Sequence, residues 1–326
     1  MNALSLPVPG RLHETNSAFS PTLPGLQIAW DSTSMGTFKE CRRKYYYSIV
    51  LGWQPRELSV HLFFGQIYHF ALEVYDHAKA RGADHDEGTR LAVRAALKAT
   101  WDKAKKKPWI SDHSTKNRLT LVRTVVWYLE QFKADPLVTL RLEEGSPAVE
   151  LSFRFQTHFK SQSGDPFLIC GHLDRVARLE GLDQLWIVDR KTTQYSIDSA
   201  YFSKYSPDNQ MSTYDFAGGI IYSYPIQGVI VDAAQVLVTL SRFERGFVPR
   251  SKSQREEWYI TFGQYVKEAE QAAKEQNWPM NDKACGHYGG CPFRPVCGRP
   301  PEAREEWLRA AYVQRVWDPL KIRGDI

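Results

Sequence analysis

The sequence has no long apolar run and no low-complexity segment. No stretch of 18 apolar residues occurs among its 326 residues, so we expect no membrane-spanning helix. The apolar run within residues 1–25 is too short for a signal peptide, and the proline, serine and glycine around it predict a flexible or draped arm. A cytoplasmic protein is therefore expected.

Neither sign of charge dominates the chain. Hydrophobic residues make up 43% and charged residues 24%, which is typical of a globular protein. The net charge of +5 and the pI of about 8.8 suit an anionic partner but do not prove one. The basic cluster Lys103, Lys105, Lys106 and Lys107 fits either such a partner or a solvated helix end.

Cysteine is scarce, and its number is odd. The five cysteines are Cys41, Cys170, Cys285, Cys291 and Cys297. An odd count without a secretion signal argues against a disulfide framework. Three of them lie within thirteen residues near the C-terminus, which points to a metal. Cys170, in the apolar run "FLIC", is most simply a buried small hydrophobe.

The hydrophobic pattern predicts helices first, then strands. Helical periodicity covers residues 32–52, 63–82, 87–104 and 115–134, later 207–222 and 253–276, and a short helix at 301–314. The predicted apolar stripes are Ile67, Phe70, Ala71, Val74 and Ala78 in one helix, and Leu119, Val122, Val126 and Leu129 in another. Strands are expected at 148–159, 167–179, 185–193 and 228–243. The pattern predicts an α/β core wrapped by helices from both ends.

The strand "LWIVDRKTT" ends in charge. Asp189 and Lys191 fall on the same face as the apolar residues before them, because side chains alternate along a strand. Taken alone they could be a surface salt bridge, worth about 0–1 kcal/mol. Asp174 on the neighbouring strand changes that interpretation. Two carboxylates at one sheet edge would repel unless a cation such as Mg²⁺ lay between them, and the lysine could then hold a water or a phosphate charge.

Three further polar residues lie at helical positions that can serve chemistry or packing. His69 flanks the apolar stripe of its helix, and a lone helical histidine is usually just packed or exposed. Gln210 and Tyr214 are four residues apart and share a helix face. They could orient a lysine or a phosphate, or simply form a helix surface.

The order of the motifs along the chain resembles that of a known family. The segments "GQIYHFALE", a Glu-bearing strand, "GHLDRV", "IVDRKTT" and "QMSTY" resemble those of the PD-(D/E)XK nuclease superfamily over roughly residues 30 to 300. They are most similar to its RecB/AddB-like and CRISPR-adaptation-type iron–sulfur exonuclease branch. The resemblance implies an α/β, restriction-endonuclease-like mixed sheet core. It divides the chain into an arm (1–30), a helical region with the first cluster cysteine (31–140), a nuclease core (141–250) and a Cys-rich C-terminal segment (251–326).

The resemblance also assigns roles to residues. It implies that His69, Asp174 and Asp189 bind Mg²⁺ or Mn²⁺, and that Lys191 positions and activates the attacking water. Gln210 and Tyr214 would orient Lys191 and the DNA backbone. Glu150 matches the acidic residue before the first core strand, although strand alternation alone would expose it to solvent.

The cysteines fit the same branch. The resemblance implies a [4Fe–4S] cluster held by Cys41, Cys285, Cys291 and Cys297, since four thiolates satisfy such a cluster. The spacing departs from the family, which commonly has two residues between the second and third cysteines where this chain has five. Zn²⁺ is the rival at a Cys₄ site, and His287 could replace one ligand. The segment "CRRKYYY" beside Cys41 could contact DNA or pack within the protein.

The activity implied is a metal-dependent DNA exonuclease acting on linear DNA in recombination, repair or DNA processing. Cleavage would leave 5′-phosphate and 3′-hydroxyl ends, and a helicase or recombinase partner is possible. Two alternatives stay open: an endonuclease with the same active site, and a non-catalytic DNA-binding recombination-accessory protein.

Overall fold

The computed structural model describes residues 17–57, 59–222 and 226–321, and its packing divides the chain into two compact units. The central unit comprises residues 58–151 and 172–250, and the terminal unit comprises 1–57, 152–171 and 251–326. Residues 1–16 of the predicted arm lie outside the described residues, whereas in its described part Leu26, Ile28 and Trp30 are buried.

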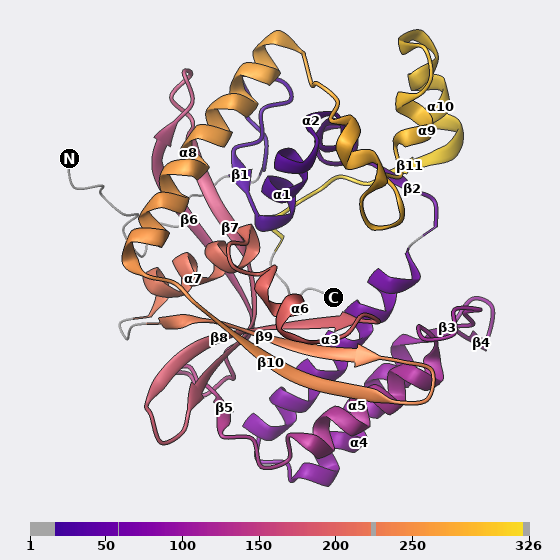
Figure 1. The fold of residues 1–326 in the computed structure, drawn as a ribbon, viewed down its shortest axis with the longest axis vertical. Coiled ribbons are helices and arrows are strands. Elements are labelled where there is room, and N and C mark those ends of the chain that lie inside the picture. The colour runs from indigo at the N-terminus through magenta and orange to yellow at the C-terminus, as the bar shows by residue number, and fades with distance from the viewer. Residues whose placement is uncertain (1–16, 58, 223–225, 322–326) are drawn as a thin grey trace. The chain divides into compact units, whose positions relative to one another are not determined.

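The central unit contains most of the mixed sheet (Figure 1). Its helices are α3 (Val60–Ala80), α4 (His85–Ala99), α5 (Arg118–Gln131), α6 (Ser199–Ser203) and α7 (Asn209–Ile221). Its strands are β3 (Trp101–Asp102), β4 (Lys107–Pro108), β5 (Leu137–Thr139), the second part of β7 (Pro166–Leu179), β8 (Gln184–Thr193), β9 (Ile226–Val236) and β10 (Ser241–Pro249). These elements confirm the predicted α/β class.

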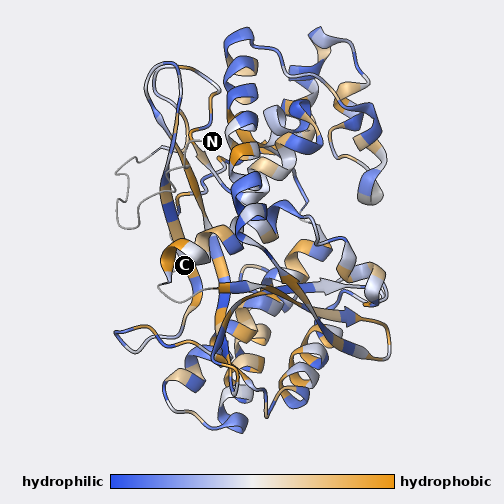
Figure 2. Ribbon diagram, turned by 60° about the vertical axis from the view of Figure 1, so that its left-hand side comes forward, coloured by the Kyte–Doolittle hydropathy of each residue, from blue (hydrophilic) through white to orange (hydrophobic). Residues whose placement is uncertain are grey.

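Strand β8 lies in the middle of this part of the sheet. It pairs antiparallel with β7, where Val188 faces Arg175, and parallel with β9, where Val188 faces Ile230. Strands β5 and β10 pair antiparallel with β7 and β9. Helix α7 contacts Ile187 on one face of β8 and helix α3 contacts Thr192 on the other, so both faces are covered, which explains the continuous apolar run before Asp189. In Figure 2 the hydrophobic residues gather along the strands.

Two helices fix the position of the site against β8. Helix α7 approaches the strand at Gly218, where a Cβ atom would lie only 2.6 Å from Cδ1 of Ile187, so a glycine is needed there. Helix α3 approaches at Gly65, whose Cβ position is 3.7 Å from Oγ1 of Thr192. Close packing on both helices thus brings polar side chains of α3 and α7 near the charged end of β8.

The predicted apolar stripes of α3 and α5 are partly wrong. Phe70 and Leu119 are 42% and 80% exposed, and the buried positions instead include Phe64, Tyr68 and Leu121. These helices pack against one another and against β9 and β10 around a shared hydrophobic core, so the buried face is wider and rotated from the simplest stripe.

The single strand predicted over 228–243 is also wrong. The chain turns after Val236 and returns as β10, with the N–H of Leu237 donating to the carbonyl of Leu240 at 2.9 Å. The turn contains no glycine, proline or asparagine, so the sequence "VLVTLS" reads as an uninterrupted strand.

The terminal unit is built around a long helix and several short ones. Its helices are α1 (Ser32–Glu40), α2 (Arg42–Tyr45), a π-helical turn (Tyr46–Val50), α8 (Lys252–Glu275), a 3₁₀ helix (Asp282–Gly289), α9 (Arg294–Cys297), a 3₁₀ turn (Pro301–Ala303) and α10 (Arg304–Ala311). Its strands are β1 (Ala29–Trp30), β2 (Trp53–Pro55), β6 (Val149–Lys160, which begins in the central unit), the first part of β7 and β11 (Tyr312–Gln314). Strand β1 runs parallel to β7, β6 also pairs with β7, and β11 pairs with β2.

The helix predicted over 32–52 is broken. Cys41 has an extended backbone, with φ −162° and ψ 116°, which ends α1 and begins α2. The three tyrosines after it pack within the unit. Tyr45 stacks on Trp30 at 5.4 Å, Tyr46 stacks on Trp278 at 5.5 Å, and buried Tyr47 packs on Phe293. The buried rings of Tyr45 and Tyr47 are therefore not available to stack on a base, and a DNA contact by the rest of the segment stays a prediction.

Other sequence predictions for this unit are confirmed. The long polar helix expected at 253–276 is α8, which begins with a capping box between Ser251 and Gln254. Cys170 is 1% exposed and packs among Ala18, Ala29 and Leu168. The short helix expected at 301–314 is observed as α10, which ends at Ala311, and the last three residues of the expected helix form strand β11 instead. Over the described ranges, no helix combines the length and apolar character required to cross a bilayer.

Candidate active site

The charged end of β8 forms a buried ion pair. The side chain of Asp189 is only 1% exposed, and that of Lys191 is 26% exposed. Nζ of Lys191 donates to Oδ1 of Asp189 at 2.9 Å and lies 2.7 Å from Oδ2. A surface salt bridge at a frayed strand end would be solvated, so the simplest alternative considered from the sequence does not describe this pair.

Burial dominates the protonation of this pair. Desolvation raises the pKa of Asp189 to about 7, and Asp174 adds to the rise while Lys191 opposes it. Burial alone would lower the pKa of Lys191, but the carboxylates of Asp189 and Asp174 raise it. Lys191 is therefore an ammonium at neutral pH.

A second helix holds this ammonium in place. Nζ of Lys191 also donates to Oε1 of Gln210 at 2.8 Å, and Nε2 of Gln210 donates to the hydroxyl of Tyr214 at 2.9 Å. Both side chains come from α7, whose N-cap Asp208 accepts the N–H of Met211 at 2.9 Å. The i, i+4 spacing puts the amide and the phenol on one helix face, and the amide orientation follows from the network.

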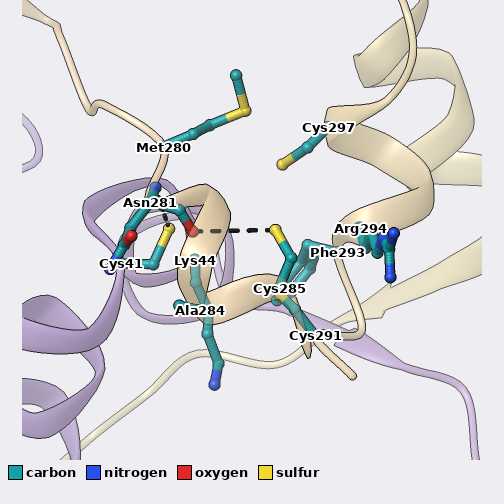
Figure 3. Close-up of a pocket in the computed structure, with 10 residues that line it drawn as sticks. All are labelled: Cys41, Lys44, Met280, Asn281, Ala284, Cys285, Cys291, Phe293, Arg294 and Cys297. Carbon is teal, nitrogen blue, oxygen red and sulfur yellow. Dashed lines mark hydrogen bonds between the residues drawn. The ribbon is translucent and has the colours of Figure 1, made fainter. Parts of the chain in front are cut away.

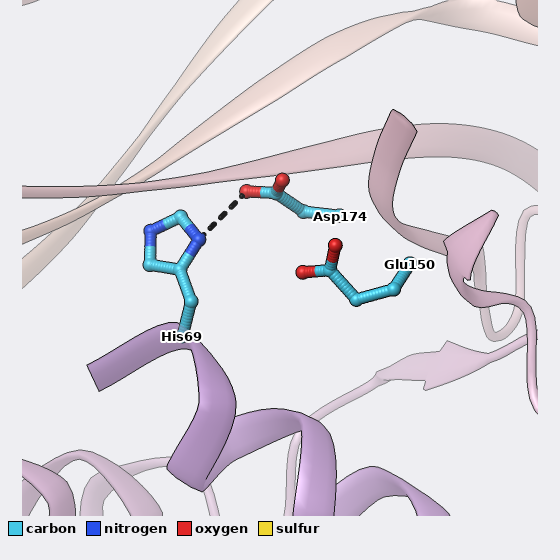
Figure 4. Close-up of side chains that lie close together, drawn as sticks. All are labelled: His69, Glu150 and Asp174. Atoms are coloured by element: carbon cyan, nitrogen blue, oxygen red, sulfur yellow. Dashed lines mark ion pairs between the residues drawn. The ribbon is translucent and has the colours of Figure 1, made fainter. Parts of the chain in front are cut away.

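A second cluster brings together His69, Glu150 and Asp174 (Figure 4). One ligand atom of each residue lies within 4.8 Å of the others, and Nδ1 of His69 is 3.3 Å from Oδ2 of Asp174. Glu150 belongs to this cluster because its φ is +50°, which turns its side chain out of the regular strand alternation. In the described part of the chain, Asp189 lies outside this compact group.

The donor set fits a divalent metal. Burial lowers the pKa of His69, so its imidazole is neutral and able to ligate. Oδ2 of Asp189 is buried, and Nζ of Lys191 is 2.7 Å from it, so a second lone pair of this oxygen is left for a cation. His69, Glu150 and Asp174 would hold the ion, with Asp189 as a further oxygen donor.

Four cysteines face one pocket of the terminal unit (Figure 3). Cys41, Cys285, Cys291 and Cys297 line a small pocket that is partly open to solvent, and all four are free thiols. The N–H of Asn281 points at Sγ of Cys41 at 3.4 Å. Backbone N–H donors to cysteine sulfur are a feature of iron–sulfur sites, so this pocket fits a cluster bound by four thiolates.

The separation of the thiols bears on which metal suits the pocket. Tetrahedral Zn²⁺ with Zn–S bonds of about 2.3 Å requires sulfurs about 3.8 Å apart. Within the ranges described, no three of the cysteine sulfurs lie within 4.8 Å of one another. His287 is exposed and is not among the residues lining the pocket.

Comparison with known proteins places the chain in a family. The model of the PD-(D/E)XK nuclease superfamily matches residues 32–298, which is most of the sequence. The chain belongs to the PD-(D/E)XK nuclease superfamily. The mixed sheet and its flanking helices are consistent with the PD-(D/E)XK fold.

Other comparisons are more distant. A solved structure of a candidate exonuclease from Eubacterium rectale shares 10% sequence identity with this chain. The alignment covers 97% of this chain and 100% of that one, with a TM-score of 0.44, too low to carry an argument about activity. No curated protein matches this sequence.

The candidate site includes a residue that sequence reasoning missed. Arg190 lies between Asp189 and Lys191, and its backbone N–H donates to Oδ2 of Asp174 at 3.0 Å. Its guanidinium points to the opposite face, where Nη2 donates to Oδ2 of Asp76 on α3 at 2.6 Å. Strand alternation could have shown the direction of this side chain, but nothing local identifies Asp76 as its partner.

Proposed function

We propose that this PD-(D/E)XK protein is a Mg²⁺- or Mn²⁺-dependent exonuclease that hydrolyses linear DNA in recombination, repair or DNA processing. The observation that carries the proposal is the chain Asp189–Lys191–Gln210–Tyr214 beside the His69–Glu150–Asp174 cluster. It combines a candidate divalent-metal site with an ammonium held in a fixed place. That combination suits phosphodiester hydrolysis, in which negative charge develops on a phosphate.

Each side chain has a distinct task in this proposal. A bound divalent ion would supply Lewis acidity and lower the pKa of a water ligand. Lys191 orients the attacking water and stabilises charge on the phosphate. Gln210 accepts one N–H of the lysine and thereby fixes the direction of the remaining two. Tyr214 anchors Gln210, and the two together would orient Lys191 and the DNA backbone. The products would carry 5′-phosphate and 3′-hydroxyl ends.

The cysteine pocket would hold a [4Fe–4S] cluster in the same proposal. Its ligands come from the junction of α1 and α2 and from the segment before α10, so the cluster would join two distant parts of the terminal unit. Because ligation and folding are coupled, the free energy of cluster binding would belong largely to folding. The four-thiolate donor set and the Asn281 N–H donor support this choice.

Four statements remain predictions. They are the division into four domains, the assignment to the RecB/AddB-like branch, a helicase or recombinase partner, and a cytoplasmic location. The preference for ends also remains a prediction, because an endonuclease would use the same residues. A non-catalytic DNA-binding role would also leave the fold intact. The experiment below separates these three possibilities.

The test is digestion of end-labelled linear DNA beside a covalently closed circle of the same sequence. It uses protein purified without oxygen, with Mg²⁺ or Mn²⁺, and compares wild type with Asp174→Ala. Loss of linear DNA alone, and only with wild type, supports the exonuclease. Cutting of the circle would replace it with an endonuclease. Binding without turnover in either metal would favour the accessory role.

A further inference from the structure

A basic hairpin in the central unit has no role in the proposed chemistry. Strands β3 and β4 pair antiparallel, with Trp101 opposite Pro108. The hairpin carries four exposed lysines, Lys103, Lys105, Lys106 and Lys107. One carboxylate, that of Asp102, lies in the same segment, so the hairpin presents a clear excess of positive charge.

That carboxylate shapes the turn. Oδ1 of Asp102 accepts the backbone N–H groups of Ala104 and Lys105, both at 3.0 Å. Its Oδ2 lies 3.6 Å from Nζ of Lys105, a distance that gives a weak, exposed ion pair. Within the described residues Lys107 has no ion-pair partner closer than 4.0 Å, so its charge is available to an anion.

A pocket separates this hairpin from the first turns of α3. Its volume is about 340 Å³, and it is partly open to solvent. The apolar lining includes Phe63, Trp101, Trp109 and Ile110, and Lys105 and Lys107 line the same pocket. The rings of Phe63 and Trp109 pack edge to face at 4.8 Å, while Trp101 is 46% exposed. Packing therefore holds one indole and leaves the other accessible.

Aromatic faces beside ammonium groups match the two chemical parts of a nucleotide. A base stacks on an indole whatever its sequence, and a lysine neutralises the phosphate next to it. In a duplex the base faces are already stacked on their neighbours, so this combination suits a single strand. The carboxylate of Asp102 is engaged by the turn and opposes this charge only partly.

We propose that this pocket, which we call the hairpin pocket, binds one nucleotide of a single-stranded DNA segment flanking the scissile bond. The base stacks on Trp101, and adjacent phosphates contact Lys105 and Lys107. This inference rests on the proposed nuclease function for the identity of the substrate. Phe63 lies six residues before His69 on α3, about 9 Å along the helix axis at ~1.5 Å per residue.

The test measures binding of a fluorescent single-stranded 20-mer in Ca²⁺ over a series of salt concentrations. The variants are Trp101→Ala and the double variant Lys105→Ala/Lys107→Ala. The matched control is Lys103→Ala/Lys106→Ala, which removes the same charge from lysines that do not line the pocket. Circular dichroism checks that each variant keeps its secondary structure.

We expect Trp101→Ala to weaken binding about tenfold, which corresponds to ~1.4 kcal/mol, within the range for one base on one aromatic ring. The Lys105/Lys107 variant should lower the salt slope of log K by about 1.4, or ~0.7 for each lost phosphate contact. The control should change both much less. An equal loss in the control, or unchanged binding by Trp101→Ala, would overturn the pocket in favour of diffuse charge.

Binding of the matching duplex is a further discriminator. If the pocket variants weaken duplex binding as much as single-strand binding, the occupant is not an unstacked base. The experiment is also independent of hydrolysis. Loss of binding in the pocket variants without any DNA cleavage by wild type in Mg²⁺ or Mn²⁺ would remove the nuclease function and leave the pocket. Cleavage by wild type together with unchanged binding by the pocket variants would support the nuclease function and remove the pocket.

Discussion

The buried ion pair between Asp76 and Arg190 tests how helix α3 is fixed to the strand that carries the candidate site. Asp76 on α3 and Arg190 on β8 are 8% and 3% exposed, with 2.6 Å between the Nη2 and Oδ2 atoms. Asp76 also accepts the hydroxyl of Thr139 at 3.2 Å. We predict that Asp76→Asn, which keeps the shape and removes the charge, strongly destabilises the central unit.

The magnitude follows from burial. Removing one partner of a buried pair leaves an uncompensated charge and typically costs ~3–5 kcal/mol. Asparagine retains an acceptor oxygen, so we expect about 3 kcal/mol. Replacing the pair together, as Asp76→Leu/Arg190→Met, should recover most of that loss, because well-packed apolar residues can replace a buried ion pair at little cost.

Urea unfolding followed by circular dichroism measures the effect. With an m-value of about 3 kcal/mol/M, a loss of ~3 kcal/mol lowers the midpoint by ~1 M. The control Asp112→Asn removes an exposed loop carboxylate and should stay within ~0.5 kcal/mol of wild type. Calorimetric titration with Mn²⁺ should also show weaker metal binding by Asp76→Asn, since the Arg190 N–H holds Asp174.

A loss below about 1 kcal/mol for Asp76→Asn would refute the reasoning, because it would mean that the charge is solvated rather than buried. A double variant as unstable as the single one would contradict it in another way. The instability would then come from lost packing or lost hydrogen bonds, not from the unpaired guanidinium.

The remaining predictions concern catalysis, the cysteine pocket and a buried amine. Lys191→Ala should abolish cleavage while sparing DNA binding, and retained cleavage would remove the lysine from the mechanism. Gln210→Ala should slow turnover more than it weakens metal binding measured by calorimetry; a pure metal-affinity defect would contradict its role. Cys291→Ala should give a colourless, poorly soluble protein, so a brown, stable variant would exclude the cluster. Burial lowers the pKa of Lys116 to about 8. The unfolded chain therefore binds more protons between pH 8 and 10.5, and stability should rise with pH across that window by ~1–3 kcal/mol. Lys116→Met should remove this rise in urea titrations and be more stable at pH 7; an unchanged pH profile would show that the amine is solvated.

The sequence predicts the site where local rules suffice. The apolar run that continues into Asp189 and Lys191 predicts the end of a strand. The four-residue spacing of Gln210 and Tyr214 predicts that both lie on one helix face. The structure brings all four side chains into one hydrogen-bonded chain. Their roles in catalysis remain predictions.

Features that depend on long-range packing or on an unusual backbone conformation cannot be predicted from local sequence patterns. Glu150 lies near His69 and Asp174 because its backbone has a positive φ. The regular two-residue alternation of a strand does not predict that conformation. Arg190 and Asp76 are 114 residues apart, so their pairing depends on how α3 packs on the sheet. The break at Cys41 interrupts a pattern that continues as a helix on both sides.

The interleaved chain path also sets an order of assembly during translation. All of the central unit precedes residue 251, so it leaves the ribosome before the last part of the terminal unit is made. Asn281, whose N–H faces the thiol of Cys41, follows that cysteine by 240 residues. At roughly 5–20 residues per second, Cys41 waits about 12–48 s for its pocket. During that interval its thiol has neither these neighbours nor the rest of the pocket that the later cysteines complete.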